Sequence, residues 1–137
     1  MTEDDQEARL AVQRLARRIR SMQGDEAVTE GQRSVLFALS NTGSQTLSAL
    51  SAHERVTPPS MNRTINALVE AGLVTRIPAE DDARKVVIDL SPTGKSFIRE
   101  TKRRRDAWFT QQLSKLTPEQ RLIIDQAIPI LREIADS

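Results

Sequence analysis

The pattern of apolar and polar positions predicts helices over most of the chain. The first, from about Asp5 to Met22, has apolar residues three and four positions apart, which places them on one helix face. These residues are Val12, Leu15, Ile19 and Met22. The sequence GDEA is expected to end this helix after Gln23.

Three more helices are predicted before the first strand. One begins at Thr29, where a threonine followed three residues later by Gln32 has the spacing of a capping box. A short helix begins at Thr46, and the next begins at Thr57, where two prolines occupy a first turn that needs no N–H donor. Gly72 ends this fourth helix. Its predicted buried side consists of Met61, Ile65, Leu68 and Val69.

The apolar period then changes to two, which is typical of strands. Residues Leu73 to Ile77 and Lys85 to Leu90 are predicted to pair as a hairpin. The link between them is polar, carries a proline and forms a charged, exposed tip.

The C-terminal third returns to helical spacing. A long helix is predicted from Pro92 to about Leu116, and a second capping box, Thr117 to Gln120, begins the last helix. Pro129 lies inside that helix and predicts a kink or a local break. The apolar side of this last helix is too wide to be buried in a monomer. We therefore expect it to pack, together with the first helix, against a second copy of the chain. The predicted dimer interface is Leu15, Ile19, Phe109, Ile123, Ile124, Ile130, Leu131 and Ile134.

Composition narrows the chemistry. The chain of 137 residues contains no cysteine, which excludes disulfides, thiolate nucleophiles, cysteine-type zinc sites and thiol redox sensing. We found no nucleophile–base set, metal cluster or phosphate loop, so no enzyme activity, metal or cofactor is predicted. No apolar run approaches a membrane span and no secretory signal is visible, which predicts a cytoplasmic protein. The net charge of +1 does not argue against nucleic acid, because binding requires a local basic face.

The order of elements predicts a mainly α (α+β) fold. A short helix pair followed by a two-strand hairpin is a winged helix-turn-helix, whose second helix presents its N-terminal residues to base edges. Asn62 offers the donor and acceptor that suit adenine, and Arg63 can contact guanine or a phosphate. The hydroxyls of Ser60 and Thr64 suit either a base edge or a phosphate. An ordinary amphipathic helix with a solvated face remains an alternative, but the following wing favours DNA.

From roughly Thr29 to Phe97 the chain resembles the MarR (multiple-antibiotic-resistance regulator) family. The resemblance is carried by SVLFAL and LSALSAHERVTPPSMNRTINALVEAGLVTRIPAEDDARKVVIDLSPTG. The family's wing element appears as Asp82-Ala83-Arg84, and its strand end appears as Leu90 to Gly94, with Ser91 where threonine is usual. The resemblance implies dimers that bind pseudo-palindromic sites, Arg84 in a minor groove and Asp82 supporting the wing. Many members are repressors released by small, often phenolic, ligands.

These arguments predict a homodimeric DNA-binding transcriptional regulator, a repressor, with recognition helix 58–71 and wing 79–85. We expect a winged-helix part, 29–91, and a helical dimerisation part, 5–23 and 92–137, in one domain, 1–137. The alternative is a winged-helix protein-interaction module without sequence-specific DNA binding. The expected partners are double-stranded DNA, a second copy and a small effector, whose pocket is predicted at Arg17, Met22, Phe37 and His53. The predicted DNA contacts are Arg55, Thr57, Pro59, Ser60, Asn62, Arg63, Thr64, Arg76, Arg84 and Lys85.

Overall fold

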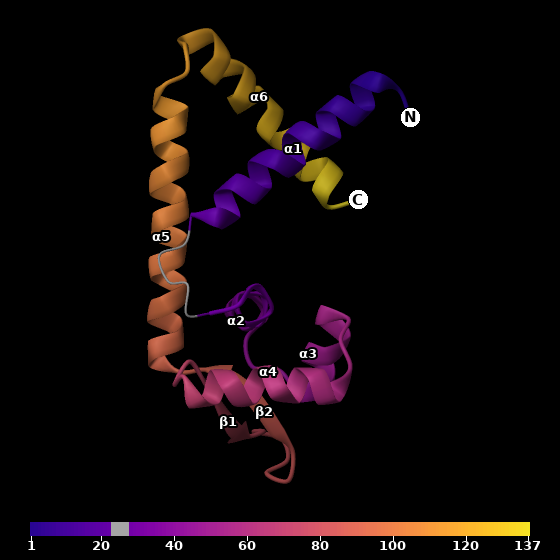
Figure 1. The fold of residues 1–137 in the computed structure, drawn as a ribbon, viewed down its shortest axis with the longest axis vertical. Helices are drawn as coiled ribbons and strands as arrows, with labels where there is room; N and C mark the ends of the chain where they lie inside the picture. The colour runs from indigo at the N-terminus through magenta and orange to yellow at the C-terminus, as the bar shows by residue number, and fades with distance from the viewer. Residues whose placement is uncertain (23–27) are drawn as a thin grey trace. The chain divides into compact units, whose positions relative to one another are not determined.

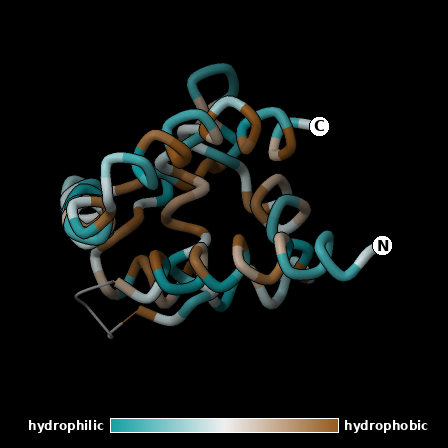
Figure 2. Tube along the Cα trace, turned by 90° about the horizontal axis from the view of Figure 1, so that it is seen from above, coloured by the Kyte–Doolittle hydropathy of each residue, from teal (hydrophilic) through white to brown (hydrophobic). Residues whose placement is uncertain are grey.

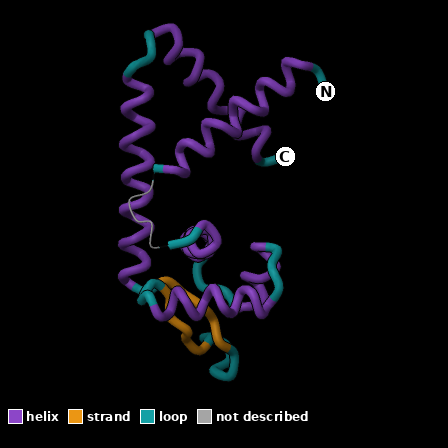
Figure 3. Tube along the Cα trace, in the orientation of Figure 1, coloured by secondary structure: helices purple, strands orange, loops and turns teal. Residues whose placement is uncertain are grey.

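The computed structural model describes residues 1–22 and 28–137 and confirms the predicted order of helices and strands. This part of the chain forms six helices and one two-stranded antiparallel sheet (Figure 1, Figure 3). The helices are α1 (Glu3–Ser21), α2 (Glu30–Thr42), α3 (Leu47–Glu54), α4 (Pro58–Glu70), α5 (Pro92–Ser114) and α6 (Pro118–Ala135). The strands are β1 (Val74–Pro78) and β2 (Val86–Leu90).

The chain divides into two compact units. One, the winged-helix unit, is Gln23–Arg103, and the other, the helical unit, combines Met1–Met22 with Arg104–Ser137. Helix α5 therefore contributes its first half to one unit and its second half to the other. Among the described residues, no helix combines the length and apolarity needed to cross a bilayer.

Threonine side chains fix where most of the helices begin. In α1, α2, α3, α4 and α6 the N-cap hydroxyl accepts from the backbone N–H three residues on, at 3.1–3.3 Å. The predicted capping boxes at Thr29 and Thr117 are confirmed, with Gln32 and Gln120 returning a bond to the cap. A third, at Thr2, was not predicted. Removing such a cap costs about 1 kcal/mol.

The apolar core of the described chain lies in the winged-helix unit. Helix α2 packs against α3 and α4, and both α2 and α3 contact β2. Arg33 is buried at the start of α2, where its guanidinium donates to the Val28 carbonyl at 3.0 Å and to Glu30 at 3.1 Å. The largest fully buried side chains are Val35, Leu36, Leu39, Leu50, Met61, Ile65, Leu68, Val74 and Ile88.

The hairpin extends from this core. Strand β1 pairs antiparallel with β2, with Val74 opposite Leu90 and Arg76 opposite Ile88. Gln45 extends the sheet by one bridge, because its backbone exchanges two hydrogen bonds with Ile88 at 2.6 and 3.0 Å. Figure 1 shows the hairpin and its loop projecting beyond α4, away from α2.

One junction ties the end of α4 to the start of α5. Gly72, at φ 77°, ends α4 in the left-handed region. The Ser91 hydroxyl donates to the Gly72 carbonyl at 2.5 Å and accepts from the Gly94 N–H at 3.0 Å. The Ser91 N–H donates to the Leu73 carbonyl at 3.0 Å. Gly94 lies directly against this backbone, so a side chain there would collide with the Leu73 carbonyl.

The helical unit has little core of its own. Neither α1 nor α6 contains a buried residue. Hydrophobic and hydrophilic segments alternate along both helices in Figure 2, as expected for helices with one apolar face. The Arg18 guanidinium lies 5.5 Å from the centre of the Trp108 ring, a cation–π contact between α1 and the second half of α5.

The structure corrects several sequence predictions. Val69 is 37% exposed rather than buried, because it lies about 100° around the helix from Leu68. Helix α4 ends at Glu70, and Leu73 closes its end by donating to the Leu68 carbonyl at 3.0 Å, so β1 begins one residue later than predicted. Of the kink or break predicted at Pro129, the break is wrong, since α6 continues through this residue, and the kink stays a prediction. The GDEA boundary and Gln23 lie outside the described residues.

Candidate nucleic-acid interface

The turn between α3 and α4 holds a strained residue. Arg55 has φ 56° and ψ 44°, in the left-handed region that costs a side-chain-bearing residue about 1–2 kcal/mol. This conformation lets the Val56 N–H donate to the Ser51 carbonyl at 3.1 Å, which satisfies the C-terminus of α3. The Arg55 side chain is exposed two residues before the N-cap Thr57. A cation is therefore held at the start of the predicted recognition helix.

The outward polar face of α4 consists of Asn62, Arg63 and Asn66, which are all exposed. Ser60 and Thr64, both predicted to contact DNA, are half-buried. The Thr64 hydroxyl donates to the Ser60 carbonyl at 3.3 Å, and Thr64 lines a hollow of about 250 Å³ shared with α2. Fewer of the predicted contact positions on α4 are fully exposed than expected, and the exposed face includes Asn66, which the sequence reasoning did not name. Its spacing of four residues from Asn62 was the available signal.

Three residues at the N-terminal end of α4 serve to begin the helix. The Thr57 hydroxyl accepts from the Ser60 N–H at 3.3 Å, so its oxygen caps the helix. Pro58 and Pro59 occupy the first turn and are exposed. Because prolines carry no N–H and the Ser60 and Met61 N–H groups are bonded to Thr57, what this helix end offers a nearby phosphate is the positive end of its dipole.

The wing tip presents an arginine on a fixed backbone. Asp82 accepts from the Arg84 backbone N–H at 3.0 Å and from its Nε and Nη2 at 3.2 and 3.3 Å. The bonds from the Arg84 side chain, and then its backbone, hold the pKa of Asp82 below its ordinary value. The Lys85 N–H donates to the Asp82 carbonyl at 3.0 Å, which tightens the turn. The Arg84 side chain is nevertheless 92% exposed. These contacts are those that the predicted supporting role of Asp82 requires.

Arg76 and Lys85 differ in their surroundings. Lys85 is exposed, with Nζ 3.9 Å from an Asp81 carboxylate oxygen, which is a weak surface pair. Arg76 extends from β1 to α4, where its Nη2 donates to Oδ1 of Asn66 at 2.5 Å and to Oδ1 of Asn62 at 3.4 Å. The sequence predicted that Arg76 contacts DNA but could not show that its side chain contacts the recognition helix.

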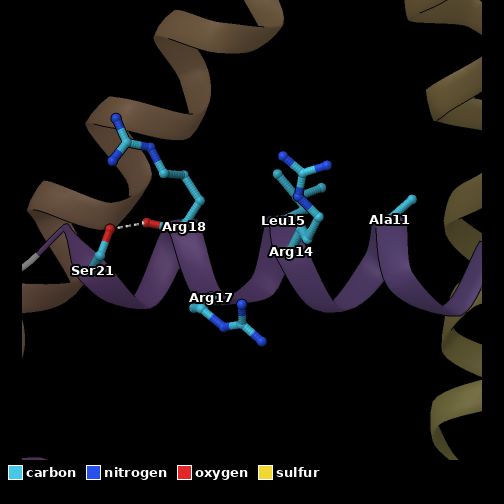
Figure 4. Close-up of a pocket in the computed structure, with 6 residues that line it drawn as sticks. All are labelled: Ala11, Arg14, Leu15, Arg17, Arg18 and Ser21. Carbon is cyan, nitrogen blue, oxygen red and sulfur yellow. Dashed lines mark hydrogen bonds between the residues drawn. The ribbon is translucent and has the colours of Figure 1, made fainter.

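The predicted effector-pocket residues lie in different units of the fold. Met22 caps the end of α1, and Arg17 borders a hollow of about 600 Å³ along that helix. Figure 4 shows Arg17 on the opposite side of α1 from the other arginines drawn. Phe37 packs against the winged-helix core. His53 lines a cavity of about 180 Å³ and lies 3.4 Å from a Glu54 oxygen. The shared pocket stays a prediction.

The predicted dimer residues on α6 are strongly exposed. Ile123, Ile130 and Ile134 expose 63, 59 and 67% of their surface, and their spacing of seven and four places them on one face. Leu15 of α1 is 45% exposed. The remaining predicted positions are Ile19 and Phe109, which are half-buried, and Ile124 and Leu131, which are exposed.

Within residues 1–22 and 28–137, no group of three or more His, Cys, Asp or Glu side chains could hold a metal ion. What the winged helix offers instead is hydrogen-bond donors and positive charge on an exposed helix face and wing.

Comparison with known proteins decides the family. Residues 28–86 match the model of the MarR family. An uncharacterized HTH-type transcriptional regulator of Mycobacterium leprae is 37% identical over 93% of this chain and 89% of its own length. The chain belongs to the MarR family. It is therefore an HTH-type transcriptional regulator, as the sequence predicted, and its winged helix is the family's DNA-binding element.

Solved structures of MarR-like proteins agree with this fold. The crystal structure of RV1404 from Mycobacterium tuberculosis has a TM-score of 0.82 and 25% identity, covering 97% of this chain and 94% of that one. A putative transcriptional regulator from Pseudomonas aeruginosa has a TM-score of 0.85 and 24% identity, covering 100% and 99%. The mainly α winged-helix fold of this MarR-family chain is thereby confirmed over essentially its whole length.

Proposed function

We propose that this regulator binds double-stranded DNA as a homodimer and represses transcription from a pseudo-palindromic operator. Helix α4 enters the major groove and the wing tip reaches the adjacent minor groove. The observation that carries the proposal is the pairing of two exposed features: the polar face Asn62 and Arg63 on α4, and the 92% exposed Arg84 on a wing fixed by Asp82. The role requires no catalysis and places the protein with the bacterial DNA, in the cytoplasm.

Each residue has a chemical role in this proposal. Arg63 can donate two bonds to guanine or hold a phosphate. Arg84 suits the negative potential of a narrow minor groove. Arg55 precedes the N-terminus of α4, where phosphate is favoured. A protein-interaction module would need none of these side chains, and this is the difference that the experiment uses.

Dimerisation follows from the helical unit. Since α1 and α6 contain no buried residue, a lone copy would leave their apolar faces in water. A twofold partner buries the same face on both copies. Two recognition helices about 34 Å apart then meet successive major grooves on one side of the duplex, so a small rotation of the heads would abolish binding.

A small effector would work by changing that head spacing. Phenolic acids are the ligand class that the family resemblance suggests. A ligand of this kind should raise the melting temperature of the protein and weaken its DNA complex. If neither changes with any phenolic acid at millimolar concentration, the effector part of the proposal is wrong.

The central test is a mobility-shift assay on the protein's own upstream DNA, repeated on a genomic DNA pool and across a salt series. We expect selective binding that weakens steeply with salt. Arg84→Ala should lower the log–log salt slope by about one. Arg63→Ala should cost about 1–3 kcal/mol of discrimination at its base pair if it contacts guanine. Lys115→Ala, which removes an exposed charge at the far end of α5, is the matched control and should bind like the wild type. Equal binding by all variants would favour the protein-interaction alternative.

A further inference from the structure

Arg76 links the wing to the recognition helix through two amides. Its guanidinium lies across Asn62 and Asn66, which are exposed and one turn apart on α4. The strand and the helix are packed against each other, so the contact joins two fixed elements rather than two mobile ones.

The contact sets which end of each amide faces DNA. A guanidinium has only donors, so only an amide oxygen can face it. Both Oδ1 atoms therefore point to Arg76, at 2.5 Å for Asn66 and 3.4 Å for Asn62. The Nδ2 groups, with two donors each, then lie on the side of the amides away from Arg76. Without Arg76, each amide could rotate and present either end.

We propose that Arg76 is a positioning residue that fixes Asn62 and Asn66 as hydrogen-bond donors toward the base edges. Recognition of adenine by asparagine needs both a donor and an acceptor on the amide. Because the oxygen of each asparagine faces Arg76, only its NH₂ group is left to face the DNA. Such donors select base edges that carry acceptors, namely O6 and N7 of guanine or O4 of thymine. This replaces the initial expectation that Asn62 suits adenine, and it rests on the proposed DNA-binding function.

A direct phosphate contact by Arg76 is the competing role, and two variants separate the two. Arg76→Lys keeps the charge, but its shorter, flexible side chain ends in a rotating ammonium, which does not hold a donor in the fixed position from which Nη2 of Arg76 contacts both amides. Arg76→Ala removes both the positive charge and the donor that contacts the two amides. A phosphate contact would survive largely in the lysine variant, whereas amide positioning would be lost in both variants.

The experiment selects binding sites from a randomised DNA pool with the wild type, then measures affinities for each base at the selected positions over a salt series. We expect guanine or thymine at the positions that Asn62→Ala and Asn66→Ala relax. Both Arg76 variants should reduce discrimination there about tenfold, and Arg76→Lys should keep the wild-type salt slope. In a protein that already carries both Asn62→Ala and Asn66→Ala, replacing Arg76 should cause no further loss of base discrimination. Thermal melting of each variant checks that it is folded.

Three results would overturn the role of Arg76. One is adenine selected at the asparagine-dependent positions. Another is unchanged base preference in both Arg76 variants. The third is a uniform loss of affinity in Arg76→Ala, with a salt slope lower by about one and recovery in Arg76→Lys, which identifies a phosphate contact. A wild type that selects no sequence at all would instead refute the proposed function itself, and with it any role of Arg76 in reading bases.

Discussion

Replacing Gly94 with alanine tests the junction between the recognition helix and α5. A Cβ at this position would lie 2.0 Å from the Leu73 carbonyl oxygen and 3.3 Å from Cδ2 of Leu90. Carbon and oxygen approach to about 3.3 Å, so the first turn of α5 and the Leu73 peptide would have to separate by roughly 1.3 Å. That carbonyl also accepts from the Ser91 N–H at 3.0 Å, and the same movement would break this bond.

The expected cost follows from these contacts. Overpacking of this kind costs about 1–3 kcal/mol, and the lost hydrogen bond adds roughly 1 kcal/mol. Alanine's better helix propensity offsets about 0.5–1 kcal/mol. We therefore expect Gly94→Ala to lower the free energy of unfolding by about 2 kcal/mol. With a urea slope of about 2 kcal/mol/M, the midpoint should fall by roughly 1 M.

The matched control is Gly31→Ala in the first turn of α2. No atom lies within 4 Å of a Cβ built there, so only the propensity gain applies. We expect it to raise stability by about 0.5 kcal/mol. Both variants should be unfolded in urea at one fixed protein concentration, since dimerisation would otherwise shift the midpoints. A Gly94→Ala midpoint equal to or above that of Gly31→Ala would refute the close approach of α5 to Leu73.

Three further outcomes are expected. Arg55→Gly should relieve left-handed strain of about 1–2 kcal/mol, less roughly 0.4–1 kcal/mol for glycine's unfolded-state entropy, so it should melt slightly higher while its DNA affinity falls. The lowered pKa of Asp82 means that its bond to the Arg84 N–H is complete at neutral pH and is lost as the pH falls below the ordinary value of 3.8; protection of that N–H from hydrogen exchange, measured relative to the intrinsic rate at each pH, should fall as the carboxylate is protonated in the wild type, whereas Asp82→Asn should show no such step. Ile130→Asp should convert the dimer to a monomer in sedimentation velocity, and a variant that stays dimeric would exclude this face of α6.

Much of the fold could be predicted because its signals are local. Threonine caps and the change of period from helical to two depend on residues a few positions apart, and Thr29, Thr46, Thr57 and Thr117 all begin helices as expected. Glycine after α4 was equally clear, because the left-handed turn at position 72 favours it. Side-chain spacing identified the buried side of α4 except at Val69. This residue follows the buried Leu68, and one step along a helix turns its side chain about 100° away, toward solvent.

The site was less predictable because its key contacts join distant positions. Nothing local shows that Arg76 reaches Asn66, ten residues before it, or that Ser91 bonds to Gly72 across the whole hairpin. Each depends on how β1 packs against α4, which only the tertiary structure determines. The same holds for Arg33: its sequence neighbours suggest an exposed charge, yet packing at the start of α2 buries it with its partners in place.

The two units also differ in how they can be stable, and this bears on how the regulator works. The apolar core found in the described chain runs from Val28 to Ile98, within the winged-helix unit. That unit can therefore hold its fold through its own contacts, while α1 and α6 contain no buried residue and, in the proposed dimer, would be stabilised by the second copy. Recognition helix, wing and the first turn of α5 are joined by Arg76 and Ser91, so these parts of the winged-helix unit should move together. Regulation by a change in head spacing then requires no remodelling of the head. It needs only a shift in the helical unit, where contacts within one copy are fewest and a modest binding energy can change the geometry.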